Sequence, residues 1–304
     1  MDYAGIENTA ALFAIIVLAG FAAGKCRLLS KQAQDGLTNL ILFVTLPCTI
    51  VNSFHIDLAP TLLPRFGLTL LVATGAQALA QLVSALAFKR QPGERKSVLR
   101  YGLIVCSSAF FGLPVLATLL GPAALALGAI YLIPQRFAMW SLGIAAFTQE
   151  KQRGALAKTL VHPNMIAVYI GLLLLLLHVT LPGWVQAPIT SVGGCTAPLS
   201  FLVIGSILSD LDPRMLKDRA LIPFCALRLV AIPGVVFLVC ALLRLPPEIT
   251  EIATLMAGMP AGTTTGLLAL RYGADERFGS TLTILSTILF FAMMPVWMSL
   301  FSLL

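Results

Sequence analysis

The chain has 304 residues, of which 58% are hydrophobic and only 11% are charged, and its mean hydropathy is +0.93. Soluble domains contain about 45–50% apolar and about 25% charged residues, so this composition excludes a soluble fold. The net charge of +7 does not indicate a nucleic-acid partner, because the Lys and Arg residues are divided among short loops instead of gathering on one helix or arm.

Apolar stretches recur along the whole chain, and each is long enough, at about 1.5 Å per residue, to cross about 30 Å of hydrocarbon. We therefore predict an all-α membrane protein with ten transmembrane helices. The predicted spans cover residues 8–24, 37–54, 62–88, 101–119, 123–147, 160–181, 189–208, 220–243, 249–270 and 279–303.

The first span is acidic before its apolar stretch and basic after it, which is the reverse of a signal peptide. We expect it to be retained with its start outside, and an even number of spans places both termini on the periplasmic or extracellular side. The five turns that would then face the cytoplasm carry 16 of the 20 basic residues. This distribution obeys the positive-inside rule.

Five spans per half is an odd number, so a duplicated half must enter the membrane the opposite way round. We predict two inverted five-helix repeats, over residues 1–158 and 159–304. Leu46–Thr49 is echoed by Ala197–Ser200, and Gly112–Pro114 is echoed by Gly258–Pro260.

Pro114 and Pro260 lie in the middle of spans four and nine, where proline removes a helical hydrogen bond and clashes with the preceding turn. We predict that both helices break there, beside a cavity and not against lipid, because the freed backbone groups need partners. The alternative is a pair of simple kinks whose hydroxyl side chains bond only their own backbone.

Broken helices at matching positions point to a transporter's binding site at mid-depth. The candidate substrate-binding residues are those at the two breaks and one deep cation: Ser107, Ser108, Gly112, Pro114, Arg136, Gly258, Pro260, Thr263, Thr264 and Thr265.

Ionisable residues inside the membrane are the next signal. All 13 acidic residues lie in loops or at span ends, which disfavours a cation/proton antiporter. Arg136 is the deepest predicted charge, either a counter-charge for an anionic substrate or a lock on carbonyls freed at a helix break. Arg228 is expected to snorkel to the cytoplasmic face, and His162 to cap span six. Buried amides such as Gln77 and Gln135 are expected to join helices.

The six cysteines are scattered singly, without a CxxC pair or histidines at metal-ligand spacing, so we expect no metal and no cofactor. No paired-carboxylate, Ser-His-Asp or HExxH arrangement indicates an enzyme.

The chain resembles the auxin efflux carrier family of bacterial permeases, which are distant relatives of the plant PIN exporters, over essentially its full length. The stretches that carry the resemblance are Gly24–Leu29, Thr45–Pro47, Phe111–Pro114, Tyr131–Trp140, Met259–Thr265 and Arg271–Gly273.

The resemblance implies the fold of sodium/proton antiporters and bile-acid carriers, with spans four and nine crossing as broken helices and a transport domain that moves like an elevator. It also implies a multi-pass protein of the bacterial inner membrane that carries weak organic acids such as auxin, malonate, malate and lactate. Ser107 stands where family members often carry Asn, which leaves the substrate open. Expected partners are a small organic anion, the lipid bilayer and, as an option, a second copy in a homodimer.

The sequence leaves three functions open. The first is a transporter of small organic anions. The second is a sodium-coupled symporter like the bile-acid carriers, with sodium held by carbonyls and hydroxyls. The third is a membrane enzyme or sensor, for which the sequence offers no catalytic arrangement and no extramembrane domain.

Overall fold

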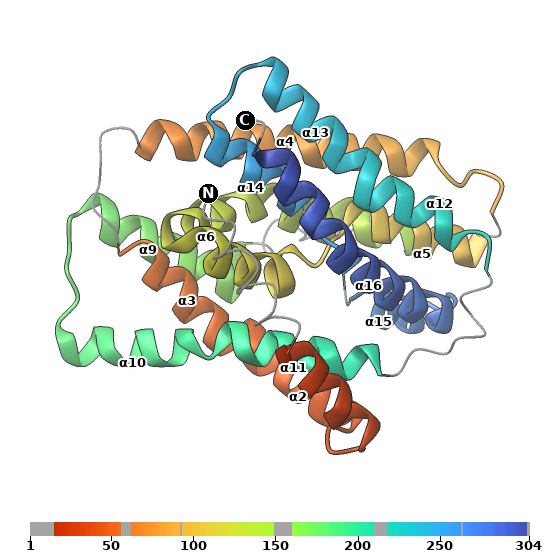
Figure 1. The fold of residues 1–304 in the computed structure, drawn as a ribbon, viewed down its shortest axis with the longest axis horizontal. Helices are drawn as coiled ribbons and strands as arrows, with labels where there is room; N and C mark the ends of the chain where they lie inside the picture. The colour runs from red at the N-terminus through yellow and green to blue at the C-terminus, as the bar shows by residue number, and fades with distance from the viewer. Residues whose placement is uncertain are drawn as a thin grey trace. The chain divides into compact units, whose positions relative to one another are not determined.

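The computed structural model describes residues 15–55, 62–91, 93–148, 160–209, 218–262 and 264–302, and these residues form helices without a β-strand (Figure 1). An unlabelled helix covers Ile15–Lys25. The labelled helices are α2 (Lys31–Leu40), α3 (Leu46–Ser53), α4 (Leu62–Leu86), α5 (Gly93–Ile104), α6 (Leu113–Ala138), α7 (Ile144–Thr148), α9 (Pro163–Leu176), α10 (Gly183–Gly194), α11 (Thr196–Leu208), α12 (Leu221–Ala226), α13 (Ile232–Leu242), α14 (Pro247–Ala257), α15 (Thr264–Arg271) and α16 (Glu276–Phe301).

Within these residues, six continuous helices are long and apolar enough to cross a membrane. They cover Lys31–Ser53, Leu63–Leu86, Ser108–Ala138, Gly183–Leu208, Leu221–Leu242 and Glu276–Phe301, and two shorter apolar helices cover Ile15–Lys25 and Pro163–Leu176. The multi-pass, all-helical prediction is confirmed at this level. Residues 8–14 of the first predicted span lie outside the described part of the chain.

Two compact units divide the chain, and each takes segments from both halves of the sequence. Unit 1 comprises Met1–Pro64, Ala109–Ile130 and Leu160–Leu211, and unit 2 comprises Arg65–Ser108, Tyr131–Thr159 and Asp212–Leu304. The predicted repeats over residues 1–158 and 159–304 describe an internal relationship that this division does not test.

In unit 1, α3 packs against α9 and α10. The Thr49 hydroxyl lies 2.8 Å from the Gly193 carbonyl, to which it donates, and 2.6 Å from the Thr196 hydroxyl. A Cβ atom on Gly205 would lie 2.0 Å from the Val17 carbonyl oxygen, so glycine is required where these two helices meet. Close backbone approach through small residues is the usual way in which membrane helices associate.

Three prolines among the described residues follow a π-helical turn by two positions. A π-helical turn widens the hydrogen-bond ladder, which makes room for a residue that has no N–H and whose ring crowds the preceding turn. The turns and prolines are Ile41–Thr45 with Pro47, Ser108–Gly112 with Pro114, and Leu227–Ala231 with Pro233.

This arrangement corrects the prediction for Pro114. The proline is the second residue of α6, and helical structure runs from Ser108 through it without a break. The real interruption in α6 is Gly121, whose φ of 83° is readily adopted only by glycine. Gly121 falls in the predicted turn between spans four and five.

Candidate functional site

The ninth predicted span is broken where the sequence predicts it. Helix α14 ends at Ala257 and α15 begins at Thr264, with non-helical backbone between them. Gly258 and Pro260 both lie in this segment, and every residue from Gly258 to Gly262 is buried. We call Gly258–Gly262 the second break.

The fourth predicted span is also broken, but before Pro114. Helix α5 ends at Ile104, and the π-helical turn begins at Ser108, so the interruption covers Val105–Ser107. We call this segment the first break. It contains neither proline nor glycine, and the paired Gly-x-Pro motifs are therefore not equivalent in the structure.

The two breaks lie side by side in unit 2 and bond to each other through their backbones. Cys106 and Ala261 form an antiparallel bridge. The Ser107 N–H donates to the Pro260 carbonyl over 2.9 Å, and the Gly262 N–H donates to the Val105 carbonyl over 3.0 Å. We call this pairing the crossing. It replaces some of the backbone hydrogen bonds that both helices lose where they are interrupted.

Arg228 fastens the two breaks together, which corrects the prediction that it snorkels to the membrane surface. Its side chain is buried, with 2% of the residue exposed. The Nε atom donates to the Met259 carbonyl over 2.8 Å, and Nη1 donates to the Leu103 carbonyl over 2.9 Å. Arg228 thus performs the locking role that the sequence analysis considered for Arg136.

Two glutamines complete the bonding of the first break. The Gln135 side-chain N–H donates to the Cys106 carbonyl over 2.6 Å, and the Gln77 side-chain N–H donates to the Ile104 carbonyl over 3.1 Å. Both confirm the expectation that buried amides join helices. At the second break, the Ala261 N–H donates to the Ser286 hydroxyl over 3.1 Å.

The predicted hydroxyl residues differ in what they already bond. The Ser108 hydroxyl donates to the Met256 carbonyl over 3.3 Å, and the Thr265 hydroxyl donates to the Gly262 carbonyl over 2.6 Å. The Thr264 hydroxyl lies 2.8 Å from that of Tyr101. The Ser107 hydroxyl makes no hydrogen bond to any described residue, which leaves it available to a ligand.

Three other predicted site residues lie either outside the described residues or in unit 1. Thr263 lies outside the described residues. Gly112 and Pro114 belong to unit 1, whereas the crossing belongs to unit 2.

Arg136 belongs to unit 2 and directly follows Gln135, whose side chain bonds the first break. Its Nη1 atom lies 3.7 Å from the Met139 sulfur, and the residue is partly exposed. Tyr101, whose hydroxyl lies beside that of Thr264, packs against Phe147 with ring centroids 5.4 Å apart. This places a second guanidinium and a tyrosine hydroxyl in the neighbourhood of the crossing.

The electrostatic character of the crossing is positive. Helical segments begin at Ser108 and Thr264, and the first N–H groups of a helix favour negative charge. Arg228 adds a full buried charge, and among the described residues no carboxylate pairs with it. The described residues also contain no cluster of three or more His, Cys, Asp or Glu side chains that would hold a metal ion.

Sequence reasoning missed Arg228, Tyr101 and Ser286 as residues of the crossing. A usable signal existed for Arg228, because an arginine that follows eight apolar residues within a predicted span needs a partner within the protein. The prediction that His162 caps span six is confirmed. The His162 side chain accepts a hydrogen bond from the Asn164 N–H over 3.3 Å at the start of α9.

One known protein family matches nearly the whole chain. A family model described as membrane transport protein, which is that of the auxin efflux carriers, matches residues 4–158 and 153–298. A search of curated proteins found no match. The match covers both halves of an apolar, all-helical chain, and it agrees with the resemblance of its motifs. The chain belongs to the membrane transport protein family of the auxin efflux carriers and is a multi-pass membrane transporter.

Proposed function

We propose that the chain is a secondary transporter of small organic anions and that the crossing in unit 2 is its binding site. The observation that carries the proposal is the buried Arg228, which is held between the two breaks without a carboxylate partner among the described residues. A buried cation in a membrane protein is expensive and marks a substrate or ion pathway. An anionic substrate would supply the missing negative charge.

In this proposal, each part of the crossing has a separate role. Arg228 positions the two breaks and contributes charge, while its Nε and Nη1 atoms remain on backbone carbonyls. The Ser107 hydroxyl and the Thr264 N–H at the start of α15 hold the carboxylate, because the next N–H, that of Thr265, already donates to the Gly262 carbonyl. Arg136 adds a second positive charge, and a guanidinium matches a carboxylate in shape.

The proposed mechanism is alternating access of the elevator type. Unit 2, which contains both breaks, is the body that we propose to move, and unit 1 is the scaffold. In this proposal, the chain has ten transmembrane helices that form two inverted repeats. It lies in the bacterial inner membrane with both termini outside. A broken helix suits this motion, because interrupted backbone is tolerated in a membrane only where it is buried in protein or lines a cavity.

A sodium-coupled symporter is less well supported. Sodium at the crossing would need the carbonyls that the breaks release. Several of these carbonyls already accept hydrogen bonds from protein donors, including those of Leu103, Val105, Met259 and Pro260.

The direct test is uptake into proteoliposomes that contain the purified protein. The panel comprises malonate, malate and lactate, together with the amine analogue propylamine as a cationic control. We expect saturable uptake of at least one carboxylate, no uptake of propylamine, and the same rate when choline replaces sodium. Uptake of no carboxylate would defeat the proposed substrate class, and loss of uptake in choline would favour the symporter.

A further inference from the structure

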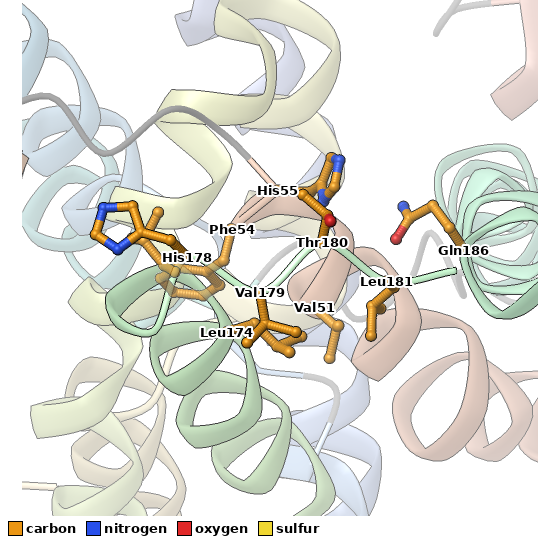
Figure 2. Close-up of a pocket in the computed structure, with 10 residues that line it drawn as sticks. Val51, Phe54, His55, Leu174, His178, Val179, Thr180, Leu181 and Gln186 are labelled. Atoms are coloured by element: carbon orange, nitrogen blue, oxygen red, sulfur yellow. The ribbon is translucent and has the colours of Figure 1, made fainter. Parts of the chain in front are cut away.

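A cavity of about 430 Å³ lies in unit 1, and its lining residues come from the ends of α3 and α9 and the beginning of α10. We call it the α9–α10 pocket. Figure 2 shows its side chains arrayed around the loop between α9 and α10, with His178 at one end and Gln186 at the other. None of its lining residues belongs to the crossing. Its size is within the range of small-molecule sites, about 300–1,000 Å³.

Three polar side chains in this pocket have no partner among the described residues. His55, His178 and Thr180 are exposed residues that make no side-chain hydrogen bond to a described residue. Gln186 differs, because its side-chain N–H already donates to the Asn52 side-chain oxygen over 2.5 Å. The unpaired groups therefore present two imidazoles and one hydroxyl, which are all able to donate hydrogen bonds.

The floor of the pocket is apolar, and its lining contains no acidic residue. Val51, Leu174, Val179 and Leu181 are among the lining residues. Hydrogen-bond donors in a pocket whose lining contains no carboxylate favour an anionic ligand. The apolar side chains favour a ligand that has a hydrocarbon part.

The backbone at His178 determines where its side chain lies. Its φ is 54°, in the left-handed region that non-glycine residues adopt uncommonly and histidine more often than most. The turn places the imidazole at the end of α9, where the helix leaves the apolar stretch. This geometry closes the end of the helix, because the Val179 N–H donates to the Leu174 carbonyl over 3.0 Å.

The surroundings of the pocket place it at the membrane interface. Helices α3 and α9 both end beside it, and Trp184 at the start of α10 is 80% exposed. Tryptophan is enriched at the boundary between headgroups and acyl chains. Leu173 and Leu177 are also exposed. A ligand that reaches this depth has a polar head and an apolar chain.

We infer that the α9–α10 pocket is a second binding site, which takes an amphipathic anion: a phosphate or carboxylate head bonded by His55, His178 and Thr180, with a short alkyl chain on the apolar floor.

The chain has only three histidines, which makes the test direct. The full-length protein is labelled with ¹³C-histidine and titrated in detergent with hexyl phosphate. We expect the imidazole signals of His55 and His178 to shift saturably, while that of His162, which does not line the pocket, stays in place. Absence of saturable shifts, equal shifts at all three histidines, or the same shifts with hexylamine would overturn the inference.

A variant and its matched control separate binding from damage to the fold. Thr180→Val removes the proposed hydroxyl ligand and should weaken hexyl phosphate binding by about fivefold. Thr74→Val is the control, because Thr74 lies on α4 in unit 2 and its hydroxyl donates to the Leu70 carbonyl. Unchanged affinity in Thr180→Val, or equal losses in both variants, would contradict the assignment.

The same titration in nanodiscs identifies the source of the anion. If a lipid headgroup occupies the pocket, phosphatidylglycerol should raise the apparent Kd for hexyl phosphate relative to phosphatidylcholine. If the natural ligand is a free amphipathic acid, the two Kd values should agree. Saturable shifts that occur in detergent and vanish in both kinds of nanodisc would overturn the inference.

Discussion

The two breaks of unit 2 are alike in geometry and different in cause. The second break contains Gly258, Pro260 and Gly262, so its own residues oppose a continuous helix. The first break, Val105–Ser107, contains only residues that a helix tolerates. Both are nevertheless non-helical and paired with each other.

A broken helix can therefore have either a local or a tertiary origin. At the first break, the released carbonyls find donors in Gln77, Gln135 and Arg228, which belong to three other helical segments. In hydrocarbon, a break without such donors would leave backbone groups unpaired at a cost of several kcal/mol. The side-chain donors therefore stabilise the interruption that the local sequence does not require.

The largest effect is expected at Arg228, because both breaks depend on it. Arg228→Met leaves the carbonyls of Leu103 and Met259 unpaired and should reduce the free energy of unfolding by about 3–5 kcal/mol. Thermal unfolding in detergent and carboxylate uptake measure the outcome. Arg244→Met, at an exposed position, should leave both nearly unchanged. An equally stable, active Arg228→Met would refute the lock.

A smaller effect should separate the first break from the second. Gln135→Leu and Gln77→Leu each remove one donor from the first break and should each cost about 1–2 kcal/mol in unfolding free energy. Ser286→Ala removes one acceptor from the second break, where Gly258 and Pro260 still oppose a helix. Its cost should be about 1 kcal/mol or less. Chemical denaturation of the three variants ranks them, and the reverse order would contradict a tertiary origin for the first break.

The smallest effect is expected at Pro114. Because helical structure runs through this proline after a π-helical turn, Pro114→Ala should change the unfolding free energy by no more than about 1 kcal/mol. Carboxylate uptake should stay at the wild-type rate. A large loss of uptake in a stable Pro114→Ala protein would return this residue to the binding site.

These contrasts explain which features of the structure could be predicted from the sequence and which could not. Apolar stretch lengths predict helices, and the local chemistry of Pro260 predicts the second break, because both depend on neighbouring residues alone. The first break does not follow from its own residues, since Arg228 lies 125 positions from Leu103 and Gln135 lies 29 positions from Cys106. Proline and glycine at Gly112–Pro114 instead drew the prediction to a nearby segment.

Arg136 and Arg228 illustrate the same limit for charges. Position along a predicted span ranked Arg136 as the deeper cation, but burial depends on which neighbours surround a side chain. Arg228 lies in a segment packed against α16 and donates to the Met259 carbonyl in the second break and to the Leu103 carbonyl at the end of α5, whereas Arg136 remains partly exposed. Depth in a span therefore does not measure depth in the folded protein.

The central claim is that an organic anion binds at the crossing, and Ser107 offers the most direct test. Isothermal titration calorimetry would compare the wild type with Ser107→Ala, using the carboxylate with the highest uptake rate. Because the Ser107 hydroxyl bonds no described residue, we predict an unchanged melting temperature and an affinity about tenfold lower. Ser108→Ala, which loses a bond to the Met256 carbonyl, should instead lower the melting temperature. Equal affinities of the wild type and Ser107→Ala would contradict the account.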